Sequence, residues 1–88
     1  MTPTVTTNIT TATTTTVKSG RGILRGIAVN TTAAGTITVY DNTAASGTKI
    51  GTIVASVTPG MYLSLPAVFT TGLTIVTGAA SDITVYYE

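Results

Sequence analysis

The sequence predicts an all-β domain built from seven to eight short antiparallel strands, on the strength of three observations. Short runs alternate apolar and polar residues, which is the period of a strand with one buried and one wet face. These runs recur at a spacing of about 8–14 residues and are separated by Gly, Pro, Asp and Asn, the residues that form turns. No stretch has the period of an amphipathic helix. This pattern is typical of a β-sandwich, a jelly roll or a small barrel.

The first part of the chain, residues 1–17, differs in composition from the rest. Ten of the first sixteen residues are Thr, which is β-branched and favours extended backbone, and apolar residues are too sparse for a buried helix. We therefore expect an extended arm here and a β-sandwich domain over residues 18–88, with the second half of the arm, about residues 11–18, pairing as a strand. The arm is either a frayed terminus or a segment that pairs with a neighbouring subunit. In the second case its partner contacts would include Thr4, Val5 and Ile9.

Three of the four cations of the chain lie within eight residues, around the turn at residues 19–22: Lys18, Arg21 and Arg25. This cluster is either a solvated turn or a docking patch for an acidic partner surface. Arg25 lies in phase with aliphatic residues that should face inward. Gly26 predicts a bulge that would turn Arg25 outward, and exit of Arg25 at an interface is the alternative.

The middle of the chain predicts a hairpin, with strands at residues 36–41 and 49–57 joined by a turn rich in Asp, Asn, Ser and Gly. A phase slip near Gly51 predicts a second bulge. The sequence I-T-V-Y of the first strand, which ends at Tyr40, occurs again near the end of the chain, where it ends at Tyr86. Both tyrosines should face outward beside Thr, where a large aromatic side chain suits an interface.

The remaining strands are expected at residues 61–65, with a short continuation to residue 70, and at 73–77 and 82–88. Pro66 interrupts the hydrogen-bonding pattern, so its strand should lie at an edge or end there. The side chains expected in the core are aliphatic: Ile23, Ile27, Val29, Ile37, Val39, Ile53, Val57, Leu63, Leu65, Leu73, Ile75, Ile83 and Val85.

The composition argues against catalysis and cofactor binding. The chain has no His and no Cys, and only three acidic residues. Asp41 and Asp82 stand at turns beside strands, where a carboxylate commonly binds local backbone, and the serines have no base to activate them. The acids are too few and too scattered for a calcium site. We therefore expect no catalytic, cofactor-binding or metal-binding residues and no small-molecule substrate.

The charge and hydropathy patterns also narrow the range of partners. A net charge of +1, with three clustered cations and no aromatic platform among them, gives little attraction for nucleic acid or an anionic membrane. No run approaches the ~18 apolar residues of a membrane span. Residues 1–3 lack the basic start and apolar core of a secretory signal, so we expect synthesis in the cytoplasm.

Two stretches carry a resemblance to a known family. Residues Val17 to Ile53 match a K-S-G-x-G-x-L-x-G-I-x-V-N run followed by a T-V-x-V-Y-D-N/G turn. Residues Gly72 to Tyr87 match a later segment of the same pattern, G-L-T-I-V-T-x-G-A-x-D-I-T-V-x-Y. The chain thus resembles small virion proteins of tailed bacteriophages, of the capsid decoration or cement type. The resemblance implies a jelly-roll-like β-sandwich, often trimeric, bound to the outside of the capsid shell, with no catalytic residues. The arm has no firm counterpart in this pattern.

Two hypotheses of function follow. In the first, the protein stabilises the capsid by bridging subunits of the major capsid protein, as a homo-oligomer and most simply a trimer, and its localisation is the exterior of the virion. The partner-binding residues would then be Thr4, Val5, Ile9, Lys18, Arg21, Arg25, Tyr40 and Tyr86. In the second, it is a tail, fibre or receptor-binding module, with exposed tyrosines as candidate contacts for glycans or a host surface: Tyr40, Tyr62, Tyr86 and Tyr87.

Overall fold

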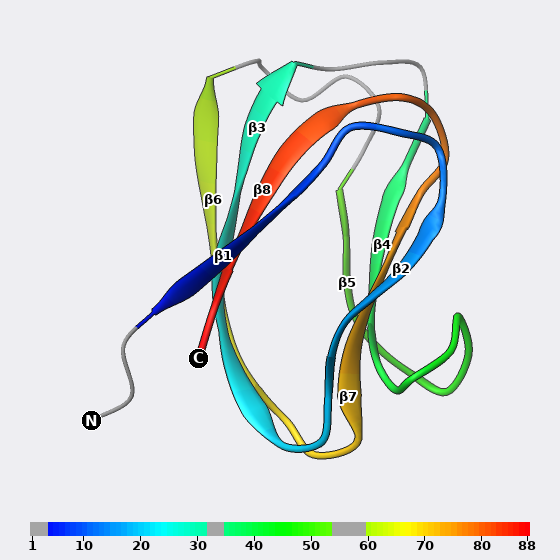
Figure 1. Ribbon diagram of the computed structural model, residues 1–88, viewed down its shortest axis with the longest axis vertical. Helices are drawn as coiled ribbons and strands as arrows, with labels where there is room; N and C mark the ends of the chain where they lie inside the picture. Colours follow the sequence, from blue (N-terminus) through cyan, green and yellow to red (C-terminus); the bar gives the residue numbers. More distant parts are fainter. Residues whose placement is uncertain (1–3, 32–34, 54–59) are drawn as a thin grey trace.

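The computed structural model describes residues 4–31, 35–53 and 60–88, and in these residues the chain forms two packed antiparallel β-sheets without helices. Figure 1 shows the sheets as two layers. The first sheet has the strand order β1-β8-β3-β6, and the second has the order β2-β7-β4-β5. The strands are β1 (Val5–Ile9), β2 (Thr14–Ser19), β3 (Gly22–Thr31), β4 (Ile37–Asp41), β5 (Thr48–Ile53), β6 (Met61–Phe69), β7 (Gly72–Thr77) and β8 (Asp82–Tyr87). The predicted all-β class and two-sheet sandwich are confirmed.

Consecutive strands alternate between the two sheets, except for β4 and β5, which form a hairpin within the second sheet. The first strand pairs with the last, the second with the seventh, the third with the sixth and the fourth with the fifth. Two further pairings, β3 with β8 and β4 with β7, complete the sheets. The chain therefore closes on itself in nested pairs, and both ends of the described chain lie in the first sheet.

The core lies between the sheets and is built from the inward side chains of both. Nine of the predicted core residues are buried: Ile27, Val29, Ile37, Val39, Ile53, Leu73, Ile75, Ile83 and Val85. Leu63 is half-buried against this cluster. Three further buried residues, Ile9, Leu24 and Phe69, were not in the predicted core. Val57 and the side chain of Leu65 lie outside the described part of the structure.

The prediction that Ile23 belongs to the core is wrong, and a bulge explains why. Along β8, Leu24 pairs with Tyr87 and Gly26 with Tyr86, so Arg25 is an extra residue on β3. An extra residue reverses the alternation on one side of it. Leu24 therefore points inward, while Ile23 is 36% exposed. The bulge predicted at Gly26 is confirmed, and it turns Arg25 outward.

Two other sequence-based expectations concern strand edges. A bulge lies at Ile50, since Val39 pairs with Gly51 and Tyr40 with Lys49, which confirms the phase slip expected near Gly51. Pro66 lies in β6, which is an edge strand of the first sheet, as its position predicted. However, β6 continues through the proline to Phe69 instead of ending there.

Most of the segment expected to form an arm belongs to strands of the two sheets. Val5–Ile9 pairs with β8, and Thr14–Ser19 pairs with β7, which confirms the strand expected over residues 11–18. The boundary expected at residue 17 falls inside β2. Residues 1–3 lie outside the described residues. An arm separate from the sandwich is therefore not confirmed.

Candidate functional site

The cationic turn predicted from the sequence lies at one end of the sandwich, where the chain crosses from β2 to β3. The neighbouring turn between β6 and β7 lies beside it, because the Gly20 amide donates a hydrogen bond of 2.9 Å to the Thr71 carbonyl. Gly20 has a φ of 92°, which favours glycine at this tight crossing. The last strand, β8, brings Glu88 to the same end, beside β3.

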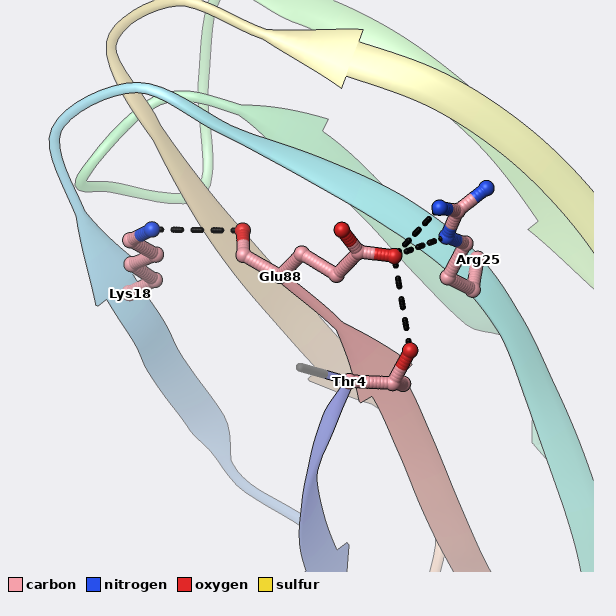
Figure 2. Close-up of polar contacts among 4 residues, drawn as sticks. All are labelled: Thr4, Lys18, Arg25 and Glu88. Atoms are coloured by element: carbon pink, nitrogen blue, oxygen red, sulfur yellow. Dashed lines mark hydrogen bonds and ion pairs between the residues drawn. The ribbon is translucent and has the colours of Figure 1, made fainter. Parts of the chain in front are cut away.

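Glu88 organises two of the three cations. Its amide donates to the Ile23 carbonyl at 2.8 Å, and its own carbonyl accepts from the Ile23 amide at 3.1 Å. Arg25 forms an ion pair with the Glu88 carboxylate, and Thr4 donates a hydrogen bond of 3.4 Å to the same oxygen. The Glu88 side chain is only 8% exposed, whereas that of Arg25 is 49% exposed. Figure 2 shows Thr4, which precedes β1, and Arg25 of β3 meeting at the Glu88 carboxylate.

Lys18 joins the two sheets at this end. A register shift between Thr16 and Lys18 makes Val17 an extra residue on β2, and Lys18 pairs with Leu73, whose side chain is buried in the core. The Lys18 ammonium donates a hydrogen bond of 3.2 Å to the Glu88 carbonyl on the opposite sheet (Figure 2). The half-buried Lys18 thus tethers the two layers and places one positive charge at the edge of the pocket described next.

An open pocket of about 290 Å³ lies at this end and is lined by Lys18, Arg21, Gly22, Ile23, Val68 and Glu88. Arg21 is exposed, and its guanidinium has no hydrogen bond or ion pair to the residues that the structure describes. Ile23 is 36% exposed and Val68 is 54% exposed. The pocket therefore offers a guanidinium beside two solvated aliphatic side chains, a combination that suits an acidic residue with an apolar neighbour.

The other predicted partner-binding residues do not share this site. Tyr40 and Tyr86 are both half-buried, but they lie on β4 and β8, on the outer faces of opposite sheets. Val5 is 46% exposed on β1. Ile9 is 4% exposed and belongs to the core, so its side chain is not accessible to a partner, and the prediction that it contacts one is corrected. Its buried position arises because β1 pairs with β8 in the same chain.

Tyr62, which the second hypothesis names as a candidate contact, forms a pair with Tyr86. The two rings meet edge to face, with centroids 5.5 Å apart and an interplanar angle of 81°. Tyr62 is 51% exposed. Its ring lies over Gly26, where a Cβ atom would contact the tyrosine and would lie 2.5 Å from the Leu63 carbonyl oxygen. The alternation of residues 61–65 indicates that Tyr62 faces outward, but its pairing with Tyr86 could not be expected, because it depends on the strand order.

Asp41 and Asp82 act as structural acceptors. Asp41 accepts hydrogen bonds from the backbone amides of Thr70 and Thr71 at 3.0 Å, and so holds the turn between the two sheets. Hydrogen bonds from Thr71 and then Thr70 lower the pKa of Asp41. The side-chain amides of Asn8 and then Asn30 lower the pKa of Asp82, at 2.7 and 3.2 Å. Both carboxylates are therefore already occupied by hydrogen-bond donors of the same chain.

The Asp41 contacts predict a pH-dependent contribution to stability. Because the folded pKa lies below the unfolded value of about 3.9, the contribution is present above that value and is lost as pH falls through the folded pKa. We expect Asp41→Asn to melt at a lower temperature than the wild type at neutral pH, and the difference to be smaller at an acidic pH below the unfolded pKa of about 3.9. Thermal unfolding followed by circular dichroism at both pH values measures this. A difference that stays the same at both pH values would contradict it.

No family model, no curated protein and no solved structure matches this chain. Among residues 4–31, 35–53 and 60–88, no three His, Cys, Asp or Glu side chains are grouped so as to hold a metal ion. None of these residues belongs to a helix long and apolar enough to cross a membrane.

Proposed function

We propose that this protein is a non-enzymatic structural protein of a tailed-phage virion, which binds the outside of the capsid and stabilises it by bridging subunits of the major capsid protein. The resemblance of residues 17–53 and 72–87 to capsid decoration proteins motivates the proposal. Binding that only the assembled shell can accept stabilises the shell by linkage, without any chemical step.

The observation that carries the proposal is the pocket at the end of the sandwich. Lys18 and Arg21 line the pocket together with Glu88, the single acid in its lining, and the Glu88 carboxylate is already paired with Arg25. Arg21 is left without a partner among the described residues and stands beside the exposed side chains of Ile23 and Val68. A positive rim around an apolar patch fits an acidic protein surface, because charge guides the encounter and apolar burial supplies affinity.

The strand order of the two sheets also supports the proposal. We infer that the sandwich is a jelly roll, which is an eight-stranded double sheet common in viral capsid domains. The two four-stranded sheets and the nested pairs β1–β8, β2–β7, β3–β6 and β4–β5 support this inference. Within the predicted arm, Thr4 and Val5 are exposed and remain candidates for partner contacts. The trimer implied by the resemblance stays a prediction that light scattering tests.

Charge reversal in the pocket tests the docking site. We expect Arg21→Glu to weaken binding to expanded capsids stripped of this protein by about tenfold or more at low salt, since it replaces attraction by repulsion. Lys49→Glu is the matched control, because it makes the same change of charge at an exposed position on β5. Occupancy measured by co-sedimentation reports the result. Equal occupancy for the two variants would refute docking through this pocket.

One observation favours the alternative, a tail, fibre or receptor-binding module. The edge-to-face pair of Tyr62 and Tyr86 on the outer side of the first sheet offers exposed aromatic surface away from the pocket. Such surface suits recognition of a host molecule. Cryo-electron microscopy of the virion separates the two functions: density over the whole head supports decoration, and density confined to the tail supports the alternative.

A further inference from the structure

The four edge strands of the sandwich differ in how well they are protected against pairing with another chain. The edges are β1 and β6 in the first sheet and β2 and β5 in the second. An edge strand presents unpaired backbone N–H and C=O groups, and proteins usually block such edges with proline, charged residues or bulges. A long, regular edge without these features is a template for strand addition.

Three of the four edges carry blocking features. On β6, Pro66 cannot donate a backbone hydrogen bond, and the register with β3 shifts between the pairs Leu24–Ala67 and Gly26–Ser64. On β5, a bulge at Ile50 lies next to the charged Lys49. On β2, a bulge at Val17 precedes the inward Lys18.

The remaining edge, β1, has none of these features. Its sequence, V-T-T-N-I, contains no proline, glycine or charged residue. Its register with β8 is unbroken over all five residues, from Val5–Tyr87 to Ile9–Ile83. Figure 1 shows β1 as the outermost strand on its side of the first sheet. One of its apolar side chains, Val5, is 46% exposed.

We propose that β1 pairs antiparallel with β1 of a second copy of this chain, so that the first sheets of two sandwiches join into one continuous sheet. The strand is self-complementary about Thr7. In this register Thr7 faces Thr7 of the second copy, Val5 faces Ile9, and Thr6 faces Asn8. Thr6 and Asn8 thus meet on the outer face, whereas Val5, Thr7 and Ile9 lie on the inner face, where Ile9 is already buried in the core of its own chain and Val5 is exposed.

Charge and exposure favour a second copy as the occupant. β1 is uncharged and each chain carries a net charge of only +1, so no like charges oppose each other across the pair. The pairing would also cover Val5, which the isolated chain leaves solvated. The contact has two-fold symmetry, because the same strand is used by both copies. It is independent of the docking pocket, and it is an alternative to the trimer implied by the resemblance.

The molecular mass of the full chain in solution tests the proposal. Sedimentation velocity and light scattering over a range of concentrations should show mass rising from 8.9 kDa for one chain to twice that value. We expect Thr6→Lys to raise the dissociation constant by about tenfold or more, since it adds a lysine to the exposed edge in each copy. Thr52→Lys, the same substitution at an exposed position on the blocked edge β5, should leave association unchanged.

A measurement on the wild type keeps the test decisive if Thr6→Lys does not fold. Hydrogen exchange of the β1 amides should speed up on dilution, while that of the β3 amides should stay constant. The proposal would be overturned by a wild-type molecular mass that stays at one chain or that corresponds to three chains. It would also be overturned by equal association of Thr6→Lys and Thr52→Lys, or by hydrogen exchange of the β1 amides that does not depend on concentration.

Discussion

Truncation of Phe69 to alanine should lower the free energy of unfolding by about 3–5 kcal/mol, the usual cost of removing a buried aromatic side chain. Phe69 is the only phenylalanine of the chain and is fully buried. It lies at the end of β6, close to Gly22 at the start of β3, so it fills the core directly beneath the candidate docking pocket. Small domains have total stabilities of about 5–15 kcal/mol, so this loss would be a large fraction of the free energy of unfolding.

Urea denaturation followed by circular dichroism measures this effect. Val68→Ala is the matched control, because Val68 is the preceding residue on the same strand but its side chain is 54% exposed. We expect the control to change the stability by no more than about 0.5 kcal/mol, as for most surface substitutions. A loss of equal size in the two variants would show that Phe69 does not fill the core as described.

Gly22→Ala should destabilise the protein by about 1–3 kcal/mol, because it overpacks the same end of the sandwich. A Cβ atom at Gly22 would lie 2.5 Å from the Glu88 carbonyl oxygen and 2.5 Å from Cζ of Phe69. Neither neighbour moves freely, since the first is backbone paired with Ile23 and the second is a buried ring. The methyl group must therefore displace Glu88, the ring or both.

A double-mutant cycle tests the two contacts of Gly22 separately. Phe69→Leu shortens the side chain that the new methyl group would meet, so Gly22→Ala should cost less in that background than in the wild type. The part of the cost caused by the Glu88 carbonyl should remain. Additive effects of the two substitutions on the free energy of unfolding would contradict this account of the packing.

The fold class followed from local pattern, because a period of two and frequent turn residues are properties of short segments. One core residue was misplaced where a bulge changed the phase, since the bulge at Arg25 exchanged Leu24 for Ile23 in the core. Phe69 was missed because the residues after Pro66 were expected only as a short continuation, whereas β6 runs unbroken to Phe69. Ile9 was assigned to a partner because the strand that pairs with its own, β8, is distant in sequence.

The candidate site was predictable only in part, for the same reason. The three cations are close in sequence, so their clustering could be expected. The residue that organises them, Glu88, is 63 positions from Arg25 and reaches it only because β8 pairs with β3. Likewise, the solvated pair of Ile23 and Val68 depends on the bulge in β3 and on the pairing of β3 with β6.

The nested strand order has a consequence for how the protein is made. β8 lies between β1 and β3 and supplies Ile83 and Val85 to the core, yet it is the last of the eight strands to leave the ribosome. Until it emerges, β1 has no strand of its own chain to pair with, and the first sheet cannot form. Since contacts between distant segments also slow folding, the growing chain should stay incompletely folded until β8 emerges. Until then β1, which has no proline, glycine or charged residue, has both of its edges free to pair with another chain.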